Sequence, residues 1–131
     1  MPILCDTHVL VWSVLEPEKL SRKAAARFDE ARSASGLACA DISLWEMAML
    51  VERGRIQSPL PVDVFLGKLC KALMLQVLPI TPGIAALAQD ARFAHGDPAD
   101  RLIAATAVAH DLDLMTADRV LQRLRHVRTV W

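Results

Sequence analysis

The sequence predicts an α/β fold in which helices cover both faces of a largely parallel sheet. Short apolar runs of strand length alternate with longer segments whose apolar residues have helical spacing, over all 131 residues. No internal repeat, low-complexity tract or linker interrupts the alternation. The hydrophobic fraction of 53% and the formal net charge of zero describe a compact chain that can bury its own core. We therefore expect residues 1–131 to form a single domain.

The first part of the chain is predicted to contain two strands and three helices. Ile3–Cys5 is an apolar run of strand length, and Thr7–Leu15 has helical spacing until acids and a proline break the pattern. Ser21–Ala34 resumes as a helix whose first residue is a suitable N-cap. Gly36–Ala40 is expected to be a short strand of small residues, and Ile42–Arg53 a strongly amphipathic helix that ends at a glycine.

The second part continues the alternation. After a proline-rich loop, we expect a helix over Val62–Leu75, a third strand over Gln76–Pro79 and a further helix over Pro82–Ala94. A turn at residues 95–98 then precedes an alanine-rich helix over Ala99–His110. The last predicted elements are a strand, a short helix and a strand, at Leu112–Thr116, Asp118–Leu124 and Val127–Val130.

Composition excludes several classes of protein. No apolar run comes near the roughly 20 residues that span a bilayer, and the N-terminus lacks the basic flank and cleavage site of a signal peptide. We therefore expect no membrane partner. The cysteines Cys5, Cys39 and Cys70 form neither an even disulfide framework nor a CxxC pair, so we expect thiols in a reducing cytoplasm. Zero net charge argues against coating nucleic acid by bulk electrostatics, but it allows a local basic rim around an acidic pocket.

Four acidic residues are expected to converge at one edge of the sheet. In parallel sheets, ligands bind beyond the carboxyl ends of the strands, and the helix N-termini lie at that same edge. Asp6 ends the first strand, and Asp118 follows the fourth. Glu46 and Asp100 lie in the first turns of helices that begin at this edge.

Such a cluster indicates a metal centre. Clustered carboxylates repel each other, and a bound divalent cation would relieve the repulsion. A set of oxygen ligands without histidine or cysteine favours Mg²⁺ or Mn²⁺ over Zn²⁺. Such a metal can orient a water and lower its pKa for attack on a phosphodiester.

Each acid also has a local structural interpretation, which the sequence leaves open. Asp97 could be the N-cap and Asp100 the N3 acid of a helix that begins at Pro98, and Ser43 and Glu46 could form a capping box. Asp118 could cap the last helix, and Asp6 could form an Asx turn after its strand. It is the joint placement of the acids at one edge that favours a site.

Four segments carry a resemblance to a known family. They contain the acids in order and at suitable spacing, and they are Leu4–Trp12, Ile42–Ala48, Asp97–Ala105 and Leu114–Asp118. Together they resemble the PIN-domain toxins of the VapC type over almost the whole chain. No single segment is specific to the family, but the four in this order are strong evidence for it.

The resemblance implies a three-layer α/β/α sandwich and an endoribonuclease that uses Mg²⁺ or Mn²⁺. It also implies the toxin of a type II toxin–antitoxin pair, with RNA as substrate, a VapB-like antitoxin as partner, and a homodimer. The family's four acids match, in order, Asp6, Glu46, Asp100 and Asp118. The first, third and fourth would hold the metal, and the second would complete its shell or position the attacking water. Ala40 and Ala99 depart from the family pattern and bear on substrate choice rather than catalysis.

Several neighbours of the acids are further candidates. Thr7 matches a hydroxyl residue that supports the metal site in the family, and Thr116 has the same relation to the fourth acid. Asp97 is either an N-cap or a ligand, and Arg101 contacts a phosphate or pairs with an acid.

Other polar and aromatic residues have both a site and a surface or core interpretation. They are His8 and His95 near the acids, Arg119, Arg123, Arg125 and Arg128 near the C-terminus, Trp12 and Trp45 on apolar helical faces, and the cluster of Met47, Met49 and Leu50. The arginines suit contacts with an RNA backbone or a solvated helix face. The apolar cluster suits core packing, a groove for an antitoxin helix, or a dimer surface.

Three alternative functions fit the sequence less well than a nuclease. A haloacid-dehalogenase-like phosphatase needs an acid and a threonine where His8 and Leu10 stand, and a receiver-like domain needs paired acids after the first strand. A degenerate PIN domain that only binds RNA or protein would usually have lost an acid, whereas all four are present here.

Overall fold

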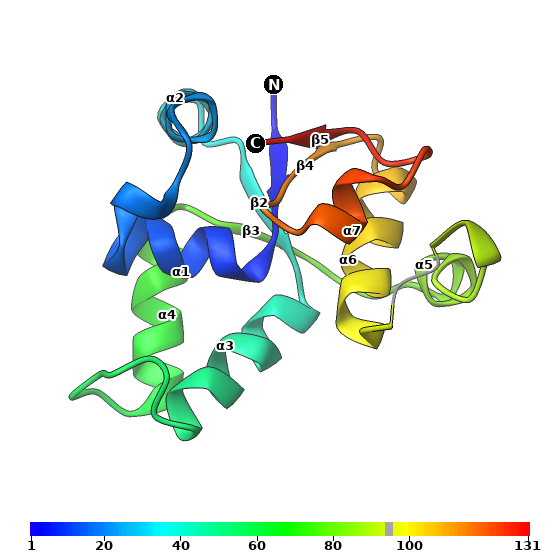
Figure 1. Ribbon diagram of the computed structural model, residues 1–131. Coiled ribbons are helices and arrows are strands. Elements are labelled where there is room, and N and C mark those ends of the chain that lie inside the picture. Colours follow the sequence, from blue (N-terminus) through cyan, green and yellow to red (C-terminus); the bar gives the residue numbers. More distant parts are fainter. Residues whose placement is uncertain (94–95) are drawn as a thin grey trace.

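The computed structural model describes residues 1–93 and 96–131 and contains one five-stranded sheet between two layers of helices (Figure 1). The strands are β1 (Ile3–Cys5), β2 (Leu37–Ala40), β3 (Gln76–Leu78), β4 (Asp113–Met115) and β5 (Thr129–Val130). Their order is β3-β2-β1-β4-β5, and each pairing in the described chain is parallel. The predicted α/β/α sandwich is confirmed, with a fully rather than mostly parallel sheet.

The helices divide between the two faces of the sheet. They are α1 (Thr7–Leu15), α2 (Arg22–Ser33), α3 (Ile42–Glu52), α4 (Val62–Ala72), α5 (Pro82–Leu87), α6 (Pro98–Ala109) and α7 (Arg119–Gln122), with 3-10 turns η1 (Pro17–Lys19) and η2 (Ala91–Phe93). In Figure 1, α1, α2 and α4 lie on one side of the sheet and α5, α6 and α7 on the other. In the described residues, every helix is too short or too polar to cross a lipid bilayer.

The alternation of side chains along the short strands builds the two cores. In β1, Ile3 and Cys5 pack with Phe28 of α2, while Leu4 between them packs with Ile103 of α6 on the opposite face. Because successive side chains of a strand point to opposite faces, a strand that is buried on both sides is apolar throughout. This explains why the strands were visible in the sequence as continuous apolar runs.

The helix after β3 is shorter than predicted. The expected helix Pro82–Ala94 ends at Leu87, and η2 follows it; residue 94 lies outside the described part of the chain. The carboxylate of Asp90 accepts hydrogen bonds from the backbone N–H and the guanidinium of Arg92, at 2.9 and 3.1 Å. Such local side-chain contacts compete with continued helix.

The predicted amphipathic pattern of the third helix is wrong. Only Ser43 and Met47 of α3 are buried, and the ring of Trp45 is 60% exposed. The helix is apolar around its circumference, and it runs outward from the sheet toward α4 (Figure 1). Trp45 is therefore a surface residue and does not belong to the core.

Candidate active site

A pocket of about 440 Å³ lies at the carboxyl edge of the sheet, beyond the ends of β1 and β4. The chain builds the sheet outward from β1 in one direction through β2 and β3, and in the other through β4 and β5. This edge is therefore the point at which the strand order reverses, where open α/β sheets bind ligands. The four acids Asp6, Glu46, Asp100 and Asp118 all line this pocket.

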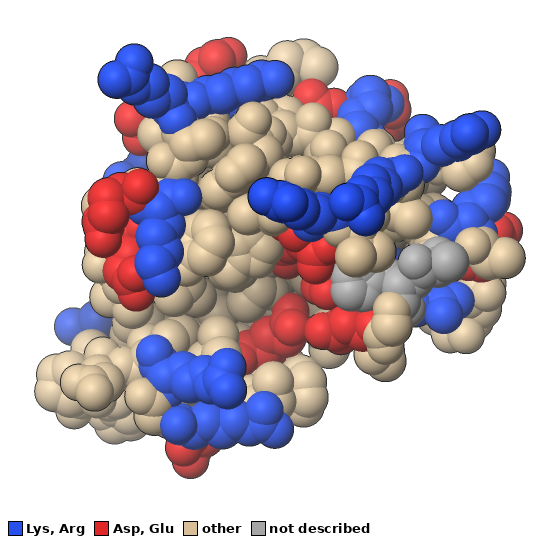
Figure 2. Space-filling model, viewed as in Figure 1, with Lys and Arg blue, Asp and Glu red and all other residues tan. Residues whose placement is uncertain are grey.

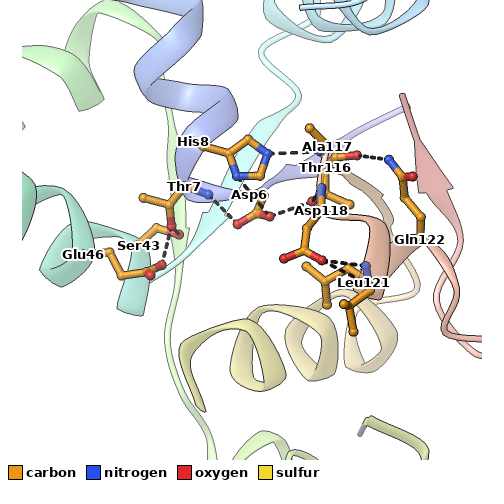
Figure 3. Close-up of polar contacts among 11 residues, drawn as sticks. Asp6, Thr7, His8, Ser43, Glu46, Thr116, Ala117, Asp118, Leu121 and Gln122 are labelled. Atoms are coloured by element: carbon orange, nitrogen blue, oxygen red, sulfur yellow. Dashed lines mark hydrogen bonds and ion pairs between the residues drawn. The ribbon is translucent and has the colours of Figure 1, made fainter. Parts of the chain in front are cut away.

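Asp6 is the buried anchor of the site, with 2% of its surface exposed. Its Oδ1 accepts a hydrogen bond from the N–H of Thr7 at 2.8 Å and caps α1, and its Oδ2 accepts one from the hydroxyl of Thr116 at 2.7 Å (Figure 3). The Oγ1 of Thr116 accepts a further hydrogen bond from the N–H of Asp118, at 3.0 Å. One hydroxyl thus connects the acid after β1 with the acid after β4.

The imidazole of His8 makes a second connection between the same segments. Its Nε2 accepts a hydrogen bond from the N–H of Ala117 at 3.0 Å, and its Nδ1 lies 3.5 Å from Oδ2 of Asp6. Because Nε2 is an acceptor, the neutral ring carries its proton on Nδ1, facing the carboxylate. His8 is therefore part of the site, and holds the loop before α7 against the start of α1.

Glu46 is held by a hydroxyl pair. The hydroxyl of Thr7 donates to Oε1 of Glu46 at 2.6 Å, and the hydroxyls of Thr7 and Ser43 are hydrogen-bonded at 2.9 Å. The alternative interpretation of Ser43 and Glu46 as a capping box does not hold, because Asp41 is the N-cap residue of α3 and the hydroxyl of the fully buried Ser43 contacts Thr7 of α1. The role of Ser43 was missed in the sequence, although a hydroxyl three residues before an acid on a helix lies on the same face.

A tighter group of acids involves Asp97. Single carboxylate oxygens of Glu46, Asp97 and Asp100 all lie within 4.8 Å of one another. Burial raises the pKa of Glu46, and the charges of Asp6 and Asp97 raise it further against the opposing hydrogen bond from the threonine hydroxyl. These carboxylates are close enough to share one divalent cation.

Asp97 and Asp118 each cap a helix and also lie among the acids of the site. Oδ1 of Asp97 accepts the N–H of Ala99 at 2.9 Å and caps α6. Oδ1 of Asp118 accepts the N–H groups of Val120 and Leu121 at 2.8 and 3.1 Å and caps α7. The local interpretation is therefore correct for both acids, yet it does not exclude them from a site.

Comparison with known proteins identifies the family of this chain. A family model described as "PIN domain" matches residues 3–127. The chain belongs to the PIN-domain family. It is similar to Ribonuclease VapC22 of Mycobacterium tuberculosis, with 43% identity over 98% of each chain, which confirms the resemblance to the VapC type.

Solved structures share this PIN fold. VapBC2 from Rickettsia felis, in a structure with a promoter DNA fragment, has a TM-score of 0.72 at 14% identity over 98% of this chain and 97% of that one. FitAcB from Neisseria gonorrhoeae has a TM-score of 0.69 at 22% identity over 97% and 95%. A toxin–antitoxin complex from Klebsiella pneumoniae has a TM-score of 0.62 at 21% identity over 95% and 94%.

Some predicted residues of the PIN domain lie away from the acids. Arg101 donates from Nε to the carbonyl of Ala88 at 2.8 Å and lines a separate pocket beside α5. Neighbouring residues on a helix face different directions, which is why Arg101 does not accompany the acid before it. Arg128 pairs with Asp111 and Asp113, each at 2.8 Å, near the start of β4 and so at the opposite edge of the sheet. The candidate His95 lies outside the described residues.

Proposed function

We propose that this PIN-domain protein is a divalent-metal-dependent endoribonuclease and the toxin of a type II toxin–antitoxin pair. The observation that carries the proposal is the pocket itself, in which acids from four separate segments of the chain meet. The name of the relative at 43% identity, a ribonuclease, supports RNA as the substrate class.

The donor set fits Mg²⁺ or Mn²⁺. Oxygens of Glu46, Asp97 and Asp100 lie within 4.8 Å of one another, and hard cations bind carboxylate oxygens at about 2.0–2.1 Å. Without a cation these carboxylates repel; burial raises the pKa of Glu46, and the charges of Asp6 and Asp97 raise it further. The acids supply only oxygen donors, which suit Zn²⁺ and Cu²⁺ less well than they suit Mg²⁺ and Mn²⁺.

In this proposal the acids divide the work. When bound, the cation supplies Lewis-acid chemistry, neutralising phosphate charge and lowering the pKa of a water. Asp6, Asp100 and Asp118 would hold it directly or through its waters. Glu46, whose Oε1 accepts a hydrogen bond from Thr7, would complete the shell, or would orient the attacking water and accept its proton.

The supporting residues keep the acids in place. The Thr116 hydroxyl fixes one oxygen of Asp6 and the backbone before α7, and His8 holds Ala117 beside it. Asp97 is proposed as a further contact of the cation or its waters, in addition to its role as N-cap of α6. Such outer contacts set the orientation of metal ligands.

The test is RNA cleavage by purified, partner-free protein with Mg²⁺ or Mn²⁺ and with EDTA, beside Asp100→Asn. We expect metal-dependent cleavage by wild type and none by the variant. Equal cleavage by both proteins would identify a contaminating nuclease. If neither protein cleaved structured or unstructured RNA, the chain would be a binding module.

We also propose a VapB-like antitoxin as partner and a homodimer as the assembly, acting as a single domain (residues 1–131) in the cytoplasm. Exposed apolar side chains support an interface: Trp45 is 60% exposed and lines a groove with Met49 and Leu102. The free thiols Cys5 and Cys39 are buried, which suits a reducing compartment. Light scattering of the purified chain, alone and co-expressed with a candidate VapB-like antitoxin, tests both assemblies.

A further inference from the structure

The pocket at the acids is larger than a metal centre requires. Its volume of about 440 Å³ lies within the roughly 300–1,000 Å³ of sites that hold a small organic molecule. Beyond the acids it is lined by the apolar residues Val11, Trp12, Leu50 and Ile56 and by the cations Lys19 and Arg55. Figure 2 shows acidic side chains gathered in the middle of this face, with Lys and Arg side chains on either side of them.

At the apolar end of the pocket, the side chains are already held in place by their neighbours. The Trp12 ring packs against the rings of His8 and Trp131, with centroids 4.8 and 5.9 Å away, and the ammonium of Lys19 lies 5.5 Å from its centroid. Ile56 is 3% exposed. A flat apolar group could therefore bind here without first ordering the side chains that receive it.

Arg55 is brought to this part of the pocket by the end of α3. Gly54 has a φ of +72°, which favours glycine, and the N–H groups of Arg55 and Ile56 both donate to the carbonyl of Leu50, at 2.9 and 3.2 Å. The chain thereby folds back toward the pocket instead of leaving the helix end. This turn presents an exposed guanidinium beside an apolar surface.

The two cations of the pocket differ in their availability. The ammonium of Lys19 lies 2.6 Å from a carboxylate oxygen of Glu16, so it already has an anionic partner. Among the described residues, the guanidinium of Arg55 has no hydrogen-bond or ion-pair partner. A guanidinium suits the planar, bidentate recognition of phosphate.

We propose that this end of the pocket is a subsite for one unpaired nucleotide of the substrate, with its base against Trp12 and a flanking phosphate on Arg55. The inference rests on the proposed function, because the scissile phosphate is placed at the acids. A nucleotide carries both a flat apolar base and an anionic backbone, which matches the two kinds of lining; an apolar peptide segment would leave Arg55 unmatched. A base paired in a duplex cannot enter such a pocket, so the strand must be single at this point.

The phosphate contact is tested by binding in a cleavage-defective background. Asp118→Asn retains a side chain that can cap α7. Fluorescence anisotropy measures the binding constant of this variant for a labelled single-stranded RNA, in Mg²⁺ and at several salt concentrations. The plot of the logarithm of the binding constant against the logarithm of the salt concentration gives a slope. We expect Arg55→Gln to reduce this slope by about 0.7, the value for one phosphate contact on a single strand. The matched control Arg22→Gln, an exposed arginine on α2 outside the pocket, should leave the slope unchanged. Equal slopes for Arg55→Gln and its parent would overturn the contact.

The base contact is tested by coupling protein and RNA changes. An abasic site is moved along the RNA, and one position should weaken binding roughly 5- to 100-fold. That loss should disappear in Trp12→Leu but persist in Trp45→Leu, whose ring lines a different groove. An equal abasic effect in all three proteins would refute the subsite.

Two further outcomes separate the proposals. If Trp12→Leu fails to fold, the exposed Arg55 still decides the case through its salt slope. If Arg55→Gln weakens antitoxin binding but not RNA binding, the subsite belongs to the protein partner and the proposal falls. The binding assays do not depend on cleavage. If the wild-type protein binds RNA through Arg55 but never cleaves RNA, the proposed nuclease activity is refuted and the subsite is retained.

Discussion

Replacing Glu46 by glutamine should stabilise the metal-free protein while greatly weakening its stabilisation by metal. The Glu46 carboxylate has an oxygen within 4.8 Å of oxygens of Asp97 and Asp100, so the substitution removes two of three pairwise repulsions. The amide oxygen of glutamine can still accept the hydrogen bond that the Thr7 hydroxyl donates at 2.6 Å. The charge is therefore removed without loss of the contact that positions the side chain.

The size of the effect follows from the separation of the charges. Two unit charges 4.8 Å apart repel by about 0.9 kcal/mol at the dielectric constant of water and about 3.5 kcal/mol at an effective value near 20. Glu46 is half-buried and faces an open pocket, so the lower value applies and the total is about 1–2 kcal/mol. For 131 residues this corresponds to a rise in Tm of roughly 3–10 °C.

The assay is thermal unfolding at pH 8, in EDTA and with increasing Mn²⁺, followed by circular dichroism. Mn²⁺ at 100 times its Kd would stabilise wild type by about 2.7 kcal/mol, so the order of the two proteins should reverse. Glu52→Gln, in the same helix and outside the pocket, is the control and should stay within about 0.5 kcal/mol of wild type. A lower Tm for Glu46→Gln in EDTA would refute the repulsion argument, and an equal Mn²⁺ response would remove Glu46 from the metal site.

Four further predictions concern the same site. Because the folded-state pKa of Glu46 is raised above 4.5, the metal-free folded state binds its proton more tightly than the unfolded state does, and the free energy of unfolding should fall as pH rises from 4.5 through the raised pKa. The difference in the free energy of urea unfolding between wild type and Glu46→Gln isolates this contribution. A difference that does not change with pH would contradict it. Asp97→Asn also removes two of the three pairwise repulsions, so it should raise Tm in EDTA and weaken Mn²⁺ binding by calorimetry, whereas Asp97→Ala should in addition lose about 1 kcal/mol from the α6 cap. His8→Ala leaves the Ala117 N–H without its acceptor and should cost about 1–3 kcal/mol in urea unfolding, with slower cleavage; unchanged stability would mean that the contact is replaced. Thr116→Val removes the hydroxyl that orients the buried aspartate and should lower Mn²⁺ affinity roughly 10- to 100-fold, and an unchanged Kd would exclude that support.

The sheet and the meeting of the acids could be predicted because both follow from local pattern and parallel topology. A strand such as Ile3–Cys5 must be apolar on both faces, so it is visible without tertiary information. Once the strands are parallel, residues that follow them, such as Asp6 and Asp118, must lie at the same edge. This geometry does not depend on the details of helix packing.

The remaining features depend on packing between elements that are distant in sequence. The closeness of Asp97 to Glu46 requires α6 to pack beside α3, which no spacing within either helix determines. The predicted glycine stop after α3 is confirmed, but the backbone bonds to Leu50 that turn Arg55 toward the pocket were not predictable from it. The partners of Arg128 are likewise set by the β4–β5 pairing and not by its basic neighbourhood.

Three of the acids in and beside this pocket are helix N-caps, and this explains how the fold tolerates them. Asp6, Asp97 and Asp118 each use a carboxylate oxygen to accept backbone N–H groups at the start of a helix. The partial positive charge of a helix N-terminus attracts the negative charge of the capping carboxylate, so each cap offsets part of the repulsion within the cluster. Glu46 is not a cap, and in its case burial and neighbouring charges raise the pKa. Alanine at a capping acid would therefore remove helix stability together with any metal contact, whereas asparagine keeps the cap, so only the asparagine variants measure what the charges do.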